Sequence, residues 1–381
     1  MASPSDQAAE IAKPRRALDR TRMERDVLKK AIGIFAEMPK RGSASSSSMP
    51  APGRCVSCAA CSRSRRAAAT GGDHVLRQDW PAYNAAQVNE AKRLPELLHG
   101  LCQGVVQAPQ SRGRPRLPLA DVVFCAVLKV YSTVSGRRAM SDLNDCQARG
   151  YITRAPHYNS TFNYLENPLL TPILKAMIEE SASPLKGVET EFAVDASGFS
   201  TSRFERWYDA KWGREVSERQ WLKAHLMCGT RTRIVTSVEI TDGAAHDSPY
   251  LPPLLNATAE RFRVAEVAAD KGYIGKRNLA AILGVGATPY IPFKTNTTGK
   301  GPELWRRMFH FYMYNRETFL RHYHRRSNVE TVFSMIKGKF GDAVRSKTPV
   351  AQVNEVLCKV LCHNLCVLIR SIYELGIELT F

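Results

Sequence analysis

The sequence lacks any uninterrupted apolar run of the ~20 residues that a membrane-spanning helix needs. Its most apolar stretch, residues 353–369, is interrupted by Glu355, Lys359, His363 and Asn364. We therefore expect this stretch to form a buried helix. The N-terminus also lacks a basic segment followed by an apolar core, so no secretory signal is expected. These absences predict a cytoplasmic protein with no membrane contact.

Acidic residues are scarce relative to basic ones: 36 Asp and Glu stand against 54 Lys and Arg, a net charge of +18. Such an excess favours an extended polyanion as partner, and double-stranded DNA is the first candidate. Disulfides are not expected, because the ten cysteines are irregularly spaced and no secretory signal precedes them. The length of 381 residues and the 44% apolar content allow two or three folded domains.

Residues 1–39 predict an amphipathic, coiled-coil-like helix, because charged residues alternate with apolar ones on a loose heptad frame. Pro14 and Arg25 occupy core positions of that frame, so a short amphipathic helix is the simpler expectation. Residues 40–74 are rich in Ser, Ala and Arg and predict a disordered linker.

Three cysteines in this linker, Cys55, Cys58 and Cys61, have C-x-x-C-x-x-C spacing, and the nearest histidine is His74. A zinc site needs four ligands. The spacing fits either such a site or unstructured cysteines, and the composition of the linker favours the second.

Residues 75–188 are expected to form helices, because apolar residues recur at helical spacing in four segments: 94–102, 117–131, 140–143 and 170–177. We expect this region to be a helical DNA-binding domain because it also contains a basic element. Arg112 and Arg114 lie between the first two segments, in the sequence Arg-Gly-Arg-Pro. Such an element either enters a narrow minor groove, where negative potential attracts Arg, or forms a basic loop leading into a helix.

Strand patterns begin at Glu191. Residues 192–194 lead into Asp195, and residues 222–228 and 234–240 alternate around Gly229-Thr230 as a hairpin. The pattern continues as helix (251–262), strand (264–268, ending at Asp270), helix (277–283), strand (288–293), loop (294–302) and long helices. This order predicts an α/β fold with a mixed sheet, a catalytic core over 189–345 and a C-terminal helical segment over 346–381.

Asp195, Asp270 and Glu330 are the candidate metal ligands. The two aspartates follow strand-like runs and are each followed by small or flexible residues. Phosphodiester cleavage can use two divalent ions about 3.5–4 Å apart, and Mg²⁺ is held by a few carboxylates together with substrate phosphate. Three such acids therefore predict a magnesium-dependent nuclease-like site, in which Mn²⁺ is able to substitute.

Glu330 shares one helix face with Tyr323, Arg326 and Lys337. At ~100° per residue, offsets of 3, 7 and 14 place the four side chains within roughly 60° of one another. A carboxylate flanked by two cations and a phenol predicts a surface for phosphate and metal. Ordinary charge pairs on a solvated helix are the alternative.

These blocks together resemble a known family. The segments Ala-Val-Asp195-Ala-Ser-Gly and Ala-Asp270-Lys-Gly-Tyr, with the Tyr323/Arg326/Glu330/Lys337 set, are similar to the catalytic blocks of bacterial insertion-sequence DDE transposases. That family belongs to the RNase H-like, retroviral-integrase superfamily, and the resemblance covers about residues 76–381. A second resemblance concerns residues 22–31, which are similar to the zipper of the small upstream protein of another insertion-sequence family.

The resemblance implies an RNase H-like catalytic core, flanked by the helical N-terminal region and the C-terminal helices. It implies that Asp195, Asp270 and Glu330 bind Mg²⁺, while Tyr323, Arg326 and Lys337 contact transposon-end DNA or orient Glu330. The expected activity is hydrolysis at terminal inverted repeats followed by 3′-OH attack on target DNA. Because a transposase of this family cuts two transposon ends, the resemblance implies a homodimer on DNA. It also implies a location in the bacterial cytoplasm, associated with the nucleoid.

Lys223 and His225 alternate on one strand with Trp221, so the three side chains share a face that points either toward the DNA or only toward solvent. Trp305 lies between Asp270 and Glu330 and fits either base stacking or core packing. The short separation of the two acids favours core packing.

Two other functions fit the same sequence. One is a non-catalytic DNA-binding remnant or repressor derived from such a transposase, which the unusual N-terminal 74 residues favour and the three intact acids oppose. The other is a structure-selective nuclease, which cleaves DNA without joining strands.

Overall fold

The computed structural model describes residues 79–107, 116–201 and 221–378. The chain divides into two compact units, Met1–His74 and Val75–Phe381, and all described residues belong to the second. The expected helix over 1–39, the linker over 40–74 with its cysteines, and the expected DNA contacts Arg112 and Arg114 lie outside the described residues.

The described chain begins with helices. Asp79 caps the first of them, since its side chain accepts a hydrogen bond of 3.1 Å from the backbone N–H of Ala82. The helices are α2 (Trp80–Cys102), α3 (Leu119–Tyr131), α4 (Gly136–Ala148), α5 (Tyr158–Leu165) and α6 (Leu170–Ala182). They include the segments in which the sequence shows helical apolar spacing.

A five-stranded mixed sheet follows in the described part of the chain, with the order β3-β2-β1-β4-β5. Its strands are β1 (Glu191–Ser200), β2 (Trp221–Gly229), β3 (Val235–Asp242), β4 (Glu266–Ala269) and β5 (Thr288–Tyr290). β1, β2 and β3 pair antiparallel, whereas β4 and β5 run parallel to β1. The α/β class and the predicted β2–β3 hairpin are therefore confirmed.

Further helices surround the sheet: α8 (Leu251–Ala259), α9 (Lys276–Gly284), α10 (Glu303–Tyr314), α11 (Arg316–Tyr323), α12 (Ser327–Phe340) and α13 (Pro349–Leu375). Two 3₁₀ turns matter for the site, η3 (Lys271–Tyr273) and η4 (His324–Arg326).

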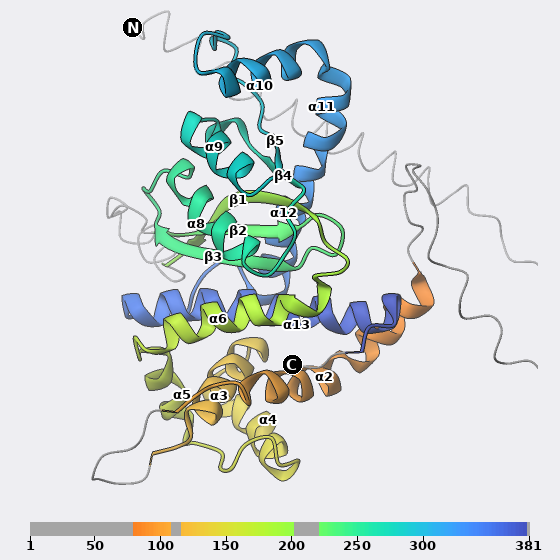
Figure 1. Cartoon of the computed structure of the whole chain (residues 1–381). Helices are drawn as coiled ribbons and strands as arrows, with labels where there is room; N and C mark the ends of the chain where they lie inside the picture. The colour runs from red at the N-terminus through yellow and green to blue at the C-terminus, as the bar shows by residue number, and fades with distance from the viewer. Residues whose placement is uncertain (1–78, 108–115, 202–220, 379–381) are drawn as a thin grey trace, which may run out of the picture. The chain divides into compact units, whose positions relative to one another are not determined.

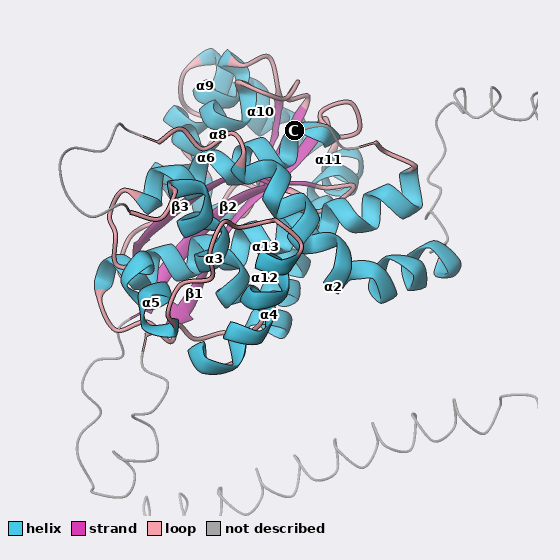
Figure 2. Cartoon of the chain, turned by 90° about the horizontal axis from the view of Figure 1, so that it is seen from below, coloured by secondary structure: helices cyan, strands magenta, loops and turns pink. Residues whose placement is uncertain are grey.

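Side chains of β1 alternate between two apolar clusters, as the period of a strand requires. Phe192 and Val194 pack in the cluster that includes residues of α8 and α9. Ala193 and Phe199 pack in the other cluster, with residues of α12 and α13. In Figure 1, α6 and α13 run side by side along the sheet, with α3 and α4 beyond them. Seen from below in Figure 2, those outer helices lie on the viewer's side of the strands.

α13 contains the apolar stretch 353–369, and the expectation of a buried helix is confirmed. It packs against α2, α3 and α6. Its interrupting residues Glu355, Lys359, His363 and Asn364 are all buried. Among the described helices, α13 alone has the length and apolar composition of a membrane span, and 78% of its most apolar window is buried inside the fold. A buried core helix can have the same length and apolar composition, so α13 is only weak evidence for a membrane-spanning segment.

Two expectations about local structure are wrong. Asp195 does not end its strand, because β1 continues to Ser200 through antiparallel pairing with β2. The run from Tyr323 to Lys337 is also not one α-helix: α11 ends at Tyr323, η4 carries Arg326, and α12 carries Glu330 and Lys337.

Candidate active site

Asp195 and Asp270 lie on adjacent parallel strands. The last parallel pair joins Val194 of β1 to Ala269 of β4. Asp195 continues β1 directly after this pair, and Asp270 directly follows the end of β4. Neighbouring strands lie about 4.8 Å apart, and residues in register point to the same face. Each carboxylate is also oriented by a backbone N–H, that of Ala196 for Asp195 (2.9 Å) and that of Lys271 for Asp270 (2.7 Å).

Glu330 lies in the first turn of α12, the helix that covers the same face of β1. Val329 and Val332 anchor this helix, because both are fully buried in the cluster that also contains Ala193. The Glu330 side chain remains 55% exposed. The sheet and α12 therefore bring the third acid to the two aspartates while leaving it open to solvent.

The three carboxylates interact electrostatically. Burial raises the pKa of Asp195, and the nearby charges of Glu330 and Asp270 raise it further. The backbone N–H of Ala196 and the guanidinium of Arg326 oppose this rise. Negative charge at this site is thus only partly compensated by the protein.

Arg326 is the cation of the site. Its guanidinium donates one hydrogen bond of 3.0 Å to Oδ2 of Asp195 and another of 2.5 Å to Oε1 of Glu330. It also lies 5.9 Å from the centre of the Tyr323 ring. Burial alone lowers the pKa of Arg326, but Tyr323, Asp195 and Glu330 together raise it, so the guanidinium is charged.

Lys337 contacts the same strand two turns further along α12. Its ammonium donates a hydrogen bond of 2.7 Å to Oγ of Ser197 and lies 5.3 Å from the centre of the Phe199 ring. Burial lowers the pKa of Lys337. The structure therefore brings Tyr323, Arg326, Glu330 and Lys337 to one face of β1, although a 3₁₀ turn interrupts the helix that carries them.

Residues 186–365 match the family model described as the transposase DDE domain. This match supports a transposase. No curated protein matches the chain. The matched segment begins just before β1 and ends within α13, so Asp195, Asp270 and Glu330 all lie inside it.

Lys223 and His225 lie on the opposite face of the sheet from Asp195. In β2 their neighbour Leu226 pairs with Asp195 and packs in the same apolar cluster as Ala193. Lys223 and His225 alternate with Leu226, so their side chains point to the opposite face of the sheet. Lys223 forms an ion pair of 2.6 Å with Asp247, and the fully buried His225 stacks on Tyr250. A buried imidazole cannot contact DNA in this conformation.

Trp305 packs against the apolar core on the α8 and α9 side of the sheet. Its ring meets Phe293 edge-on, with centres 4.9 Å apart, and its indole N–H donates to the carbonyl of Thr298. It is half-buried beside the cluster that includes residues of α8 and α9. The expectation of core packing is confirmed.

A group of residues that the sequence did not suggest holds η4 in place. Arg325 forms an ion pair with Glu191 of β1, and His322 lies 2.7 Å from Glu266 of β4. His322 also stacks on Tyr290, with ring centres 4.6 Å apart. These contacts tie the turn that carries Arg326 to the strands that carry the aspartates. No local pattern links residues so distant in sequence.

Within the described residues, no group of three or more His, Cys, Asp or Glu side chains is arranged as a ready-made metal site. The chemistry of Asp195, Asp270 and Glu330 nevertheless fits a hard divalent ion, because all three offer carboxylate oxygens and two of them already hold a shared cation, Arg326. Binding of a metal would require the guanidinium to move or to share these oxygens.

Proposed function

We propose that this protein is a DNA transposase, which binds the terminal inverted repeats of its own element and cleaves and joins DNA with Mg²⁺, or with Mn²⁺ in its place. The observation that supports the proposal is that Asp195 and Asp270 follow a paired position of β1 and β4, while Arg326 joins Asp195 to Glu330. The match of residues 186–365 to the transposase DDE domain supports it independently.

We propose an RNase H-like fold for the catalytic domain over 189–345. The strand order β3-β2-β1-β4-β5, with an antiparallel β1–β3 meander and parallel β4 and β5, supports it. Helices over 75–188 would bind DNA, and the segment over 346–381 would complete the core through α13.

Asp195, Asp270 and Glu330 would hold the divalent ions, which when bound lower the pKa of a water and stabilise developing negative charge on phosphate oxygens. Arg326 orients two of these carboxylates through its hydrogen bonds to Asp195 and Glu330. Lys337, held by Ser197, presents an ammonium to the DNA phosphates beside them. Tyr323 lies against Arg326 and limits the directions in which the guanidinium can move.

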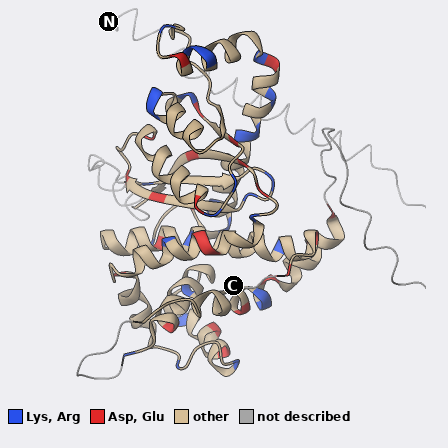
Figure 3. Cartoon of the chain, in the orientation of Figure 1, with Lys and Arg blue, Asp and Glu red and all other residues tan. Residues whose placement is uncertain are grey.

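DNA is the partner that the charge of the chain favours. The net charge is +18, and basic residues recur along the elements around the acids, including Arg306, Arg321 and Lys337. Figure 3 shows blue segments of Lys and Arg on the ribbons of α9, α10 and α11, which Figure 1 labels. Phosphate contacts from such residues make affinity fall steeply with salt. Because two transposon ends must be cut together, we also propose a homodimer on DNA in the cytoplasm.

An excision assay on a donor plasmid that carries the gene with its flanking DNA tests this function. Asp195→Asn, Asp270→Asn and Glu330→Gln should each reduce Mg²⁺-dependent cleavage by at least about 100-fold, the scale of losing one preorganised electrostatic group. Glu317→Gln, an exposed acid on α11, serves as the matched control and should cleave like the unaltered protein.

Each outcome has a distinct meaning. Wild-type cleavage by all three variants would contradict the proposal. Binding of DNA without any cleavage in Mg²⁺ or Mn²⁺ would indicate a non-catalytic remnant or repressor. Cleavage without joined products would indicate a nuclease of the same fold.

A further inference from the structure

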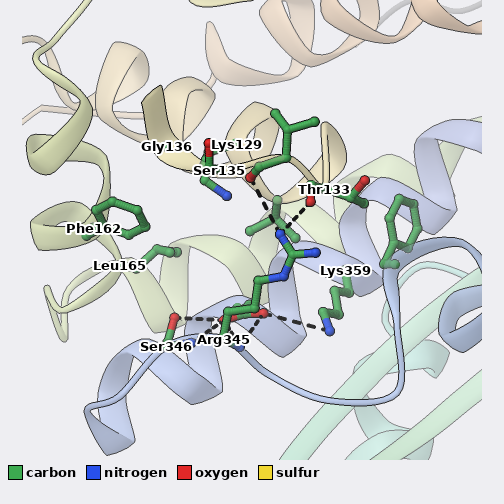
Figure 4. A pocket seen from close by; sticks show the side chains of 13 residues that line it. Lys129, Thr133, Ser135, Gly136, Phe162, Leu165, Arg345, Ser346 and Lys359 are labelled. Atoms are coloured by element: carbon green, nitrogen blue, oxygen red, sulfur yellow. Dashed lines mark hydrogen bonds and ion pairs between the residues drawn. The ribbon is translucent and has the colours of Figure 1, made fainter. Parts of the chain in front are cut away.

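A cavity of about 460 Å³ lies on the helical side of the described chain, away from the three acids. Its walls come from the end of α3, the start of α4, Phe162 of α5 and the loop after α12, as Figure 4 shows. The volume lies within the range of about 300–1,000 Å³ that is usual for ligand pockets. The transposase activity proposed above assigns it no role.

Positive charge exceeds negative charge in this cavity. Lys129, Arg345 and Lys359 line it, and Glu355 is the one acid among its lining residues. Glu355 is already occupied: both its oxygens accept hydrogen bonds from the backbone N–H of Arg345, and Ser346 donates two more. Glu355 therefore holds the loop at Arg345 and Ser346 in place. Three cations and one acid line the cavity, so positive charge remains in excess.

Two of the cations have protein partners. The ammonium of Lys359 donates to the carbonyls of Gly341 (3.1 Å) and Ala343 (2.7 Å). The guanidinium of Arg345 donates to the carbonyl of Thr133. Both residues thus shape the loop and the wall of the cavity (Figure 4).

Lys129 has no such partner. Only 7% of the residue is exposed, and within the described residues its ammonium forms a cation–π contact but no hydrogen bond or ion pair. Its nearest recognised contact is the face of the Phe162 ring, 5.9 Å away. The ammonium lines the cavity, and burial of the residue lowers its pKa. An anion in the cavity would therefore stabilise its charge.

The N-terminus of α4 meets the same cavity. Ser135 and Gly136 line it, the side chain of Ser135 makes no capping hydrogen bond, and the first turn contains no acid. The free N–H groups and dipole of a helix N-terminus favour an anion. Gly136 lets the Phe162 ring approach this turn closely, since a Cβ on Gly136 would lie 2.8 Å from two carbons of the ring and the ring would have to shift.

We propose that this cavity binds a phosphate group, with the ammonium of Lys129 and the N-terminal N–H groups of α4 as its ligands. The phosphate belongs either to a bound DNA strand, in which case the inference rests on the proposed function, or to a free anion. Exposed cations that follow lining residues in the sequence, Arg137 and Arg138 after Gly136 and Lys347 after Ser346, favour the DNA.

The position of the cavity also suits DNA. Phe340, which lines it, ends the helix whose first turn carries Glu330, and the ten residue steps from Glu330 to Phe340 span about 15 Å along the helix. At about 3.4 Å per nucleotide, this length corresponds to roughly four nucleotides of one strand. A strand held at the acids can therefore extend to Lys129.

The test measures binding rather than cleavage, on the full chain. Lys129→Met removes the charge and keeps the length of the side chain, Lys129→Arg restores a cation, and Lys186→Met removes an exposed lysine outside the cavity. DNA affinity is measured over a range of NaCl concentrations with flanking DNA of the gene, and melting temperature is measured with and without inorganic phosphate.

Lys129→Met should weaken DNA binding about tenfold and reduce the slope of log K against log salt by about 0.9, the value for one phosphate contact. Lys129→Arg and Lys186→Met should bind like the unaltered protein. If inorganic phosphate raises the melting temperature of the unaltered protein but not of Lys129→Met, while DNA affinity is equal in both, the site takes a free anion.

Equal DNA affinity, equal salt slope and equal response to phosphate in Lys129→Met and the unaltered protein would overturn the inference. Circular dichroism of Lys129→Met checks the fold. The same binding experiment in an Asp195→Asn background separates the two proposals, because loss of cleavage there leaves the phosphate contact intact. If the protein binds no DNA but phosphate stabilises it through Lys129, the proposed function fails and the phosphate site stands.

Discussion

The guanidinium of Arg326 donates a hydrogen bond to Oδ2 of Asp195 at 3.0 Å, across 131 positions of sequence. The same guanidinium reaches Oε1 of Glu330 at 2.5 Å. One arginine therefore joins a strand acid to a helix acid, in the place where a divalent cation would neutralise the same two charges. This relationship makes the protein's response to metal depend on Arg326.

Arg326→Gln should destabilise the protein and increase its response to Mg²⁺. Without the guanidinium, Asp195 and Glu330 lose their shared cation, and we expect a loss of about 1–2 kcal/mol in free energy of unfolding without metal. Most of the loss should come from the contact with Asp195, because the Glu330 side chain is 55% exposed. Urea unfolding in EDTA and in millimolar Mg²⁺ measures both effects.

The control is Arg316→Gln, which removes an exposed arginine of α11. Within the described residues, the guanidinium of Arg316 contacts only the ring of Tyr312. Mg²⁺ should stabilise the Arg326→Gln variant more than this control. Equal stabilisation in the two variants would mean that the guanidinium and the metal do not share ligands.

Asp195→Asn should make the protein more stable at neutral pH. Burial, followed by the charges of Glu330 and Asp270, raises the pKa of Asp195 in the folded state. A carboxyl group with a raised folded pKa favours folding when protonated, and this contribution is lost as pH rises through that pKa. The ionised Asp195 is thus unfavourable at pH 7, and the neutral amide removes the penalty.

The difference between the two proteins should shrink as pH falls toward about 4, the ordinary value for Asp, where the native carboxyl becomes protonated. Urea unfolding of both proteins at pH 7 and pH 4, without metal, measures the difference. Glu317→Gln provides the reference for removing one exposed acid. A stability difference that is independent of pH would contradict the assignment.

Lys337→Met should weaken DNA binding and lower its salt dependence, whereas Ser197→Ala should leave the salt dependence unchanged. The lysine supplies a charge to phosphate, so its loss should reduce the salt slope by about 0.9. Ser197 only anchors the ammonium through a hydrogen bond of 2.7 Å. Salt-dependent binding assays distinguish the two, and equal slopes for Lys337→Met and the unaltered protein would remove Lys337 from the DNA contacts.

Much of the sheet could be predicted because local pattern determines it. The alternation in β2 and β3 and the turn after Gly229 predict the hairpin that the structure contains. The extension of β1 beyond Asp195 could not be predicted in this way, since Ala196, Ser197 and Gly198 have weak strand propensity. These residues are extended because their backbones pair with β2.

The site shows the same division between local and distant effects. Helical spacing predicts that Tyr323, Arg326, Glu330 and Lys337 share one side, but the segment contains no Gly or Pro that would mark the 3₁₀ turn. Ion pairs from Arg325 to Glu191 and from Arg326 to Asp195 accompany that turn. The alternation in β2 predicts that Lys223 and His225 share a face, but local sequence does not identify Asp247 as their partner.

Asn364 joins α13 to both α6 and β3 through hydrogen bonds of its side-chain amide. Its side-chain amide donates to the carbonyls of Ile178 (3.2 Å) and Val235 (2.7 Å) and to Oγ of Ser181 (2.9 Å), and its carbonyl accepts from the N–H of Val235 (2.9 Å). The residue is fully buried. Its four hydrogen bonds therefore satisfy both backbone groups of the first residue of β3.

Asn364→Leu keeps a similar volume but leaves those backbone groups without partners. Each buried group that loses its hydrogen bond costs about 1–3 kcal/mol, so we expect a loss of about 2–4 kcal/mol in free energy of unfolding. Asn159→Leu, at an exposed position of α5, should change stability by about 0.5 kcal/mol or less. Urea unfolding compares the two, and similar values would show that β3 reaches α13 through apolar packing alone.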